Sequence, residues 1–103
     1  MPQAEYSIED SDQGPVLRVR GEIDLATAGE LRARIGEHAE DAGGPAILDV
    51  SGVTFIDSTG LKALVGAQAD LGGGRRLALQ GVPPLFRRVL EMTGMLDVFD
   101  LLD

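Results

Sequence analysis

Four consecutive residues, Asp57-Ser58-Thr59-Gly60, bring together a carboxylate, two hydroxyls and a glycine. They follow the short apolar run 53–56 and precede a segment whose apolar residues recur at helical spacing, so a predicted strand gives way here to a predicted helix. Either Asp57 or Ser58 is the natural N-cap of that helix. A hydroxyl at a helix N-terminus is also placed where free backbone N–H groups and the helix dipole would hold a phosphate. The tetrapeptide is therefore compatible with a structural cap and with a phosphorylation site.

Two enzymatic uses of these residues are disfavoured by their surroundings. A serine-hydrolase elbow needs glycine two residues before the nucleophile, where Ile56 stands, and its base would have to be His38, the only histidine. An aspartate that accepts a phosphoryl group, as in response-regulator receivers, needs an acidic pair and a later lysine, and no lysine follows Lys62. We therefore expect no enzymatic activity, and we expect His38 to be a helix residue without a ligand role.

The composition of the 103 residues excludes several other classes. With 17 Asp and Glu against 9 Lys and Arg, the net charge is -8, and the scattered cations do not form the basic cluster that nucleic acid requires. The absence of cysteine excludes thiol catalysis, disulfides and Cys-based zinc sites. No window approaches the about 18 apolar residues of a membrane span, and the first residues carry no secretory signal. We expect a cytoplasmic protein without cofactor, direct nucleic-acid contact or membrane insertion.

Strand and helix patterns alternate along the chain. Turn residues at 12–15 predict a hairpin between a strand near 6–9 and the alternating strand 16–20. Thr27 and Glu30 have the spacing of a capping box for a helix that Gly43-Gly44 would end. The later predicted elements are a strand at 46–50 interrupted by Ser51-Gly52, a strand at 53–56, a helix ending at 72–74, and a strand at 77–79. A last helix begins at Pro83-Pro84. Its residues Leu85, Phe86, Val89 and Met92 are expected in the core.

This alternation predicts an α/β fold formed by a single domain over residues 1–103. Right-handed crossovers give a mixed, mostly parallel sheet of four to five strands, with the hairpin as an antiparallel addition and the helices packed mainly on one face. In such sheets functional groups gather where strand C-termini meet helix N-termini. That rule directs attention to residues 56–60.

Three blocks of this sequence resemble one family. The run from Ile47 to Leu61, which contains D-S-T-G, closely resembles the signature of STAS domains, specifically the anti-sigma factor antagonists of bacterial partner-switching systems. Gly21-Glu22-Ile23-Asp24 with Thr27-Ala28 is similar to the family's G-E-hydrophobic-D-x-x-T-A segment. Residues 90–99 resemble its C-terminal helix and tail. Three blocks in the right order are far more specific than D-S-T-G alone.

The resemblance implies a role in regulating transcription, for example in a stress response. In the family, the unphosphorylated protein binds an anti-sigma factor that is also a serine kinase, and the sigma factor is released. Phosphorylation by that kinase ends the complex, a phosphoserine phosphatase reverses the modification, and the free protein is a monomer. The resemblance identifies Ser58 as the phosphorylated residue. The residues implied to surround it and to contact the partner are Asp24, Asp57, Thr59, Gly60 and Lys62.

Lys62 departs from the family pattern, which usually has a small residue there. It is a solvated helix residue or, one turn after Ser58, a contact for a phosphate or an acidic partner. Two other functions remain open. The fold also serves as a docking subunit of lipid-transport ATPases without phosphorylation, and a small α/β enzyme is the third possibility. The serine within D-S-T-G favours the regulatory switch.

Overall fold

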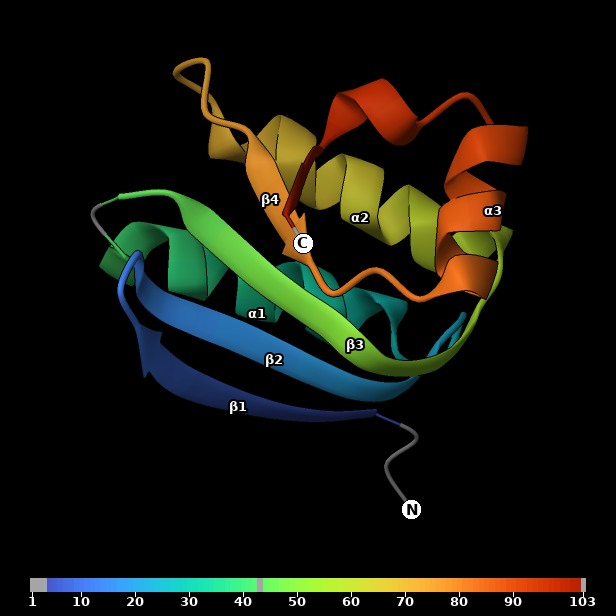
Figure 1. Ribbon diagram of the computed structural model, residues 1–103, viewed down its shortest axis with the longest axis horizontal. Helices are drawn as coiled ribbons and strands as arrows, with labels where there is room; N and C mark the ends of the chain where they lie inside the picture. Colours follow the sequence, from blue (N-terminus) through green and yellow to red (C-terminus); the bar gives the residue numbers. More distant parts are fainter. Residues whose placement is uncertain (1–3, 43, 103) are drawn as a thin grey trace.

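The computed structural model describes residues 4–42 and 44–102, which form a five-stranded sheet with three helices (Figure 1). The strands lie in the order β1-β2-β3-β4-β5. None of the helices in these two ranges has the length and apolarity needed to cross a membrane. The elements are β1 (Ala4–Ser11), β2 (Gly14–Ile23), α1 (Ala28–Ala42), β3 (Ala46–Ile56), α2 (Ser58–Leu71), β4 (Leu77–Gln80), α3 (Pro84–Met92), a 3-10 turn at Leu96–Val98, and β5 (Asp100–Leu102).

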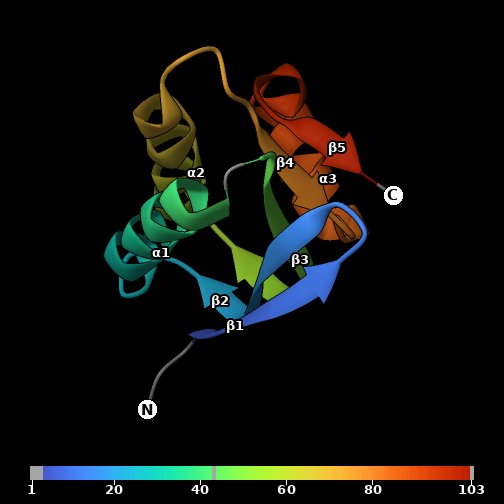
Figure 2. The same cartoon turned by 90° about the vertical axis from the view of Figure 1, so that its left-hand side faces the viewer.

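The connections explain where the helices lie. β1 and β2 form the predicted antiparallel hairpin, in which Ser11 lies opposite Gly14, and every later pair of strands is parallel. Right-handed crossovers that advance in one direction across a sheet place their helices on the same face. α1 and α2 accordingly lie side by side on one face of the sheet (Figures 1 and 2). The predicted fold class is confirmed.

The main core lies between the sheet and the helices. Leu17, Leu48 and Leu79 occupy matching positions on neighbouring strands and are almost completely buried. They pack with Leu31 of α1 and Leu64 of α2 in one cluster. A smaller cluster of Val16, Ile47 and Ala78, with Leu102 packed against it, contains the side chains that alternate to the opposite face.

β3 is one continuous strand of 11 residues, so the predicted interruption at Ser51-Gly52 is wrong. The pairing with β2 shifts register instead: Arg18 lies opposite Asp49, whereas Arg20 lies opposite Gly52. A bulge of this kind inserts an extra residue without ending the strand. The bulge keeps Ser51-Gly52 within β3, although this dipeptide by itself favours a turn.

The predicted capping box at the start of α1 is also wrong. The Thr27 hydroxyl donates to the Glu22 carbonyl at 2.8 Å and accepts from the Asp24 backbone N–H at 2.9 Å. Thr27 thereby closes the loop that precedes the helix, and no hydrogen bond between its hydroxyl and Glu30 is found among the described residues. α1 ends at Ala42, beside the predicted stop at Gly43-Gly44, of which Gly43 lies outside the described residues.

α3 begins as predicted at Pro83-Pro84, but it faces the core differently from the prediction. Phe86 and Leu90 are buried, whereas Leu85 is 74% exposed and Met92 is 77% exposed. α3 carries two apolar stripes, one formed by residues 85, 89 and 92 and the other by residues 86 and 90. Only the stripe of residues 86 and 90 faces the core. The predicted core positions of Leu85 and Met92 are therefore wrong.

The chain after α3 follows a glycine-capped turn to the sheet edge. Gly94 has a φ of +72° and donates to the Glu91 carbonyl, while the Met95 N–H donates to the Leu90 carbonyl. These two bonds form the Schellman motif in which glycine is favoured. The tail, which the sequence pattern left unassigned, then adds β5 as a parallel strand beside β4.

Candidate functional site

The corner between β3 and α2 is capped by Asp57. Asp57 has extended backbone angles, and its side-chain Oδ1 accepts a hydrogen bond from the Gly60 N–H at 2.9 Å. Its carbonyl accepts the N–H of Leu61, also at 2.9 Å, as the first bond of the helix. Of the two cap residues that the sequence allowed, Asp57 fills the role.

Ser58 is consequently available for another role. It is the first residue of α2, its side chain is exposed, and its hydroxyl takes part in none of the hydrogen bonds found between described residues. The first N–H groups of a helix have no intrahelical partner, and Asp57 satisfies only that of Gly60. The N–H groups of Ser58 and Thr59 therefore remain to interact with an anion, at the positive end of the helix dipole.

Gly60 allows α2 to start directly against the end of β2. A Cβ atom at Gly60 would overlap the Ile23 carbonyl oxygen and would lie 2.6 Å from Ile23 Cγ2. The Asp57 N–H donates to the same Ile23 carbonyl at 3.3 Å. The missing side chain of Gly60 therefore lets the backbone at the end of β2 lie directly against the first turn of α2.

Asp24 lies in the loop that follows β2, beside this corner. Its Oδ1 accepts the Ala26 N–H at 3.0 Å, and its carbonyl accepts the N–H groups of Thr27 and Ala28. Since Ile23 bonds to Asp57, the loops that follow β2 and β3 meet at one end of the sheet (Figure 1). The next residue, Leu25, is 80% exposed.

The other two predicted residues lie on the first turns of α2. Thr59 is half-buried, and Lys62 is exposed one turn after Ser58. Among the described residues, no carboxylate lies within ion-pair distance of Lys62. The structure thus brings all six predicted site residues to the carboxyl ends of β2 and β3. Within the described ranges, no group of three or more His, Asp or Glu side chains could hold a metal ion.

An apolar groove beside this corner was missed by the sequence analysis. It has a volume of about 460 Å³ and runs between the end of β3 and α3. Phe55, three residues before Ser58, is 48% exposed there. The signal was present in the stripe of Leu85, Val89 and Met92, which was assigned to the core. The residues lining the groove are Val53, Thr54, Phe55, Ile56, Pro83, Pro84, Leu85, Phe86, Arg88, Val89 and Met92.

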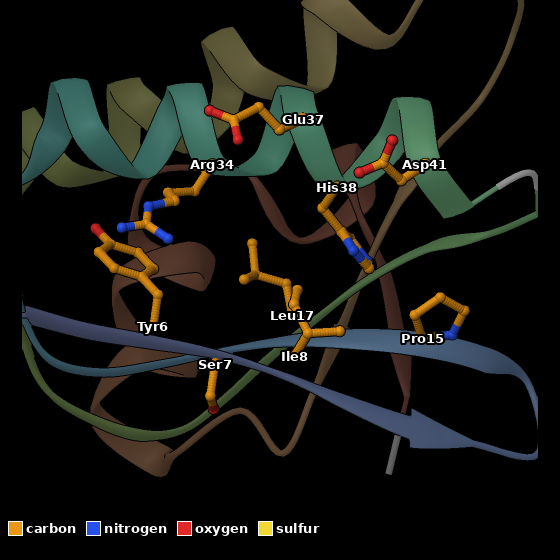
Figure 3. Close-up of a pocket in the computed structure, with 9 residues that line it drawn as sticks. All are labelled: Tyr6, Ser7, Ile8, Pro15, Leu17, Arg34, Glu37, His38 and Asp41. Carbon is orange, nitrogen blue, oxygen red and sulfur yellow. The ribbon is translucent and has the colours of Figure 1, made fainter.

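A second cavity, of about 300 Å³, lies between β1 and α1 and shares no residue with the Ser58 corner (Figure 3). His38 reaches from α1 toward the strands and is only 5% exposed. Burial lowers the pKa of His38, although the backbone of Ile47 and the charge of Asp41 oppose the shift. Tyr6 Oη and His38 Nε2 have no hydrogen-bond partner in the described structure. Both atoms are closed off from solvent, so neither is presented to a ligand in this conformation.

Comparison with known proteins identifies the family of this chain. Residues 6–103 match the family model described as "Mlab, STAS domain". The chain belongs to the STAS domain family. The anti-sigma-F factor antagonist RsfB of Mycobacterium tuberculosis is 32% identical over 95 residues, which cover 92% of this chain and 78% of RsfB. The anti-sigma-B factor antagonist of Listeria monocytogenes is 32% identical over 84 residues, covering 81% of this chain and 74% of that protein.

A solved STAS structure extends the comparison to three dimensions. The crystal structure of an anti-sigma factor antagonist from Mycobacterium paratuberculosis has a TM-score of 0.79 and 33% sequence identity, and the match covers 95% of this chain and 84% of that one. The resemblance of the three sequence blocks to STAS anti-sigma factor antagonists is therefore confirmed.

Proposed function

We propose that this STAS protein is an anti-sigma factor antagonist whose binding is switched by phosphorylation of Ser58. One observation carries the switch: Asp57 caps α2, and the Ser58 hydroxyl is exposed without a structural hydrogen bond. A kinase can therefore modify the Ser58 hydroxyl without breaking the cap of α2. The relatives are named as antagonists of anti-sigma factors, which supports the class of partner.

The proposed partner is an anti-sigma factor that is also a serine kinase. The kinase active site must reach Ser58, so this residue lies inside the interface that the unphosphorylated protein forms. Phosphorylation adds about -1.5 to -2 charges at neutral pH. Binding of the partner would remove water from the phosphate. The neighbouring carboxylates of Asp24 and Asp57 carry charge of the same sign, so they do not compensate for the lost hydration energy. A mispaired charge at an interface costs about 2 to 5 kcal/mol, which weakens binding about thirtyfold to several thousandfold.

The modification itself should leave the backbone nearly unchanged. The N–H groups of Ser58 and Thr59 are positioned to donate hydrogen bonds to phosphate oxygens without refolding. The carboxylate of Asp57 opposes the phosphate, but its Oδ1 stays bonded to the N–H of Gly60. Lys62 supplies the nearest cation along the exposed face of α2. The switch then acts by charge at the interface, with no catalytic step on this protein.

The affinity of two Ser58 variants for the purified kinase tests the proposal. Ser58→Ala should bind about as tightly as the wild type and stay bound in the presence of ATP. Ser58→Glu should bind at least thirtyfold more weakly, whereas Ser7→Glu, the same charge on an exposed serine of β1, should bind normally. Equal affinities of Ser58→Ala and Ser58→Glu by calorimetry would contradict the switch and favour the docking subunit of a lipid-transport ATPase.

Phosphate labelling tests the position of the site. A cognate kinase should place one phosphate on Ser58, and a phosphoserine phosphatase should remove it. Mass spectrometry that located the label on Thr59 or Ser51 would be incompatible with the proposed site. The proposed kinase, phosphatase and cytoplasmic location belong to this same hypothesis.

A further inference from the structure

The groove between β3 and α3 is exposed because β3 extends beyond its neighbour. The pairing of β3 with β4 ends at Asp49, and the rest of β3 continues beside β2 alone. α3 occupies the place beside the end of β3 and directs Phe86 and Leu90 inward. Its outer stripe, Leu85, Val89 and Met92, is left to line the groove together with Phe55.

The exposed apolar side chains are not scattered over the molecule. Five large hydrophobic residues are exposed among the described residues, and three of them, Phe55, Leu85 and Met92, line this groove. A fourth, Leu25, follows Asp24 in the loop on the β2 side of the Ser58 corner. Clusters of this kind on a protein surface mark interaction sites. The groove wall includes Phe55, three residues before Ser58 in the sequence, and Leu25 adds one exposed apolar side chain in the loop after β2.

The groove also carries a charge that distinguishes its partner. Arg88 lines it and has no carboxylate within ion-pair distance among the described residues, whereas the neighbouring Arg87 pairs with Glu91 at 3.7 Å. A cation of this kind on a chain of net charge -8 favours a partner that presents a carboxylate beside apolar side chains.

We propose that the anti-sigma factor kinase docks apolar side chains in this groove, with a carboxylate opposite Arg88, while its active site faces Ser58. The proposal rests on the function proposed above and extends the interface from the Ser58 corner onto α3. Continuity supports this single occupant, because the same four residues, Phe55 to Ser58, pass from the groove wall to the phosphorylation site. The groove surface itself is the same in both phosphorylation states, and the charge at the Ser58 edge weakens the complex as a whole.

Two exposed residues of α3 allow a direct test by calorimetry with purified anti-sigma factor kinases from the source organism. Leu85→Ser and Met92→Gln should each lower the affinity of the binding kinase about tenfold to a hundredfold, as for central interface residues. Ile8→Thr is the matched control, because Ile8 is 57% exposed on β1, away from the groove. Arg88→Gln should also weaken binding, whereas Arg87→Gln should not.

The outcomes separate this inference from the proposed function. If Ser58→Glu loses binding while Leu85→Ser and Met92→Gln bind like Ile8→Thr, the groove is not part of the interface and the inference is overturned. If no kinase binds, or Ser58→Ala and Ser58→Glu bind equally, the proposed function fails first. A photo-crosslinking residue at position 85 should react with the bound kinase, and one at position 8 should not; the reverse pattern also excludes the groove.

Discussion

The capping of α2 by Asp57 predicts that two neighbouring residues differ in their effects on stability. Asp57→Ala removes the 2.9 Å bond to the Gly60 N–H and leaves that donor without its partner at the helix start. Loss of an N-cap costs about 1 kcal/mol of unfolding free energy, within a range of about 0.5 to 2. In a domain of about 100 residues, 1 kcal/mol corresponds to a decrease of about 4 to 8 °C in Tm.

Ser58→Ala should behave differently. The exposed Ser58 hydroxyl makes no hydrogen bond within the described structure, and alanine is the better helix former. Its unfolding free energy should therefore stay within about 0.5 kcal/mol of the wild type. Asp57→Asn is the control that separates cap from charge, because asparagine caps about as well as aspartate.

Urea unfolding of the three variants gives the free energies, and calorimetric scans give the Tm values. The expected order of stability is wild type, Ser58→Ala and Asp57→Asn together, with Asp57→Ala clearly lower. A loss of 1 kcal/mol or more in Ser58→Ala, with Asp57→Ala unaffected, would show that Ser58 is the functional cap. The main structural reason for assigning Ser58 a regulatory role would then be gone.

Three further predictions concern the elements that hold the corner in place. Gly60→Ala should lower the unfolding free energy, measured in urea, by about 1 to 3 kcal/mol, because the added Cβ overlaps the end of β2. Gly36→Ala is the control, and it should stabilise α1 because open space surrounds Gly36. Equal effects of the two substitutions would refute the close approach at Gly60. Asp49→Ala should cost about 1 to 3 kcal/mol, because its bonds from Ser51 and Gln80 are lost in a buried place, and an unchanged midpoint would contradict this. The lowered pKa of His38 means that the folded state binds fewer protons, so stability should fall as pH drops below about 6.5, and His38→Gln should remove that slope.

The titration of Asp49 affects stability in a separate pH range. Burial acts to raise the pKa of this carboxyl, but hydrogen bonds from Ser51 and Gln80 and the charge of Arg18 outweigh it and lower the pKa. A lowered carboxyl pKa contributes stability above its ordinary value of about 3.8, and that contribution is lost as the pH falls through the folded value. Unfolding measured between pH 7 and 5 therefore reports His38 without interference from Asp49.

Local sequence chemistry was sufficient to predict the fold class and the strand-to-helix corner that carries the candidate site. The glycines and prolines that separate the apolar runs are strong local signals, and the crossover rule then leaves few arrangements of the sheet. The corner at Asp57 to Gly60 could be predicted because a strand, a cap and a glycine follow each other without a gap. These features depend on neighbouring residues and are readable without the rest of the chain.

The errors occurred where a side chain had two possible partners at different sequence distances. Ser51-Gly52 favours a turn locally, yet pairing with β2 keeps it in the strand as a bulge. Thr27 has the spacing to cap α1, but its hydroxyl oxygen accepts a hydrogen bond from the Asp24 N–H instead. Leu85 and Met92 share helical spacing with the buried residues of α3, and only the packing of Phe86 decides which stripe turns inward. Periodicity predicts a helix without giving its rotation.

The exposed stripe of α3 divides the proposed interface into two parts, the groove and the Ser58 edge. If the groove supplies constant apolar contacts, the free energy of binding has one part that phosphorylation leaves alone and one that it reverses. Combining Leu85→Ser with Ser58→Glu should then give additive losses, because distant sites in an interface are nearly independent. A coupling above about 0.5 kcal/mol would mean that the groove and Ser58 contact the same partner residues.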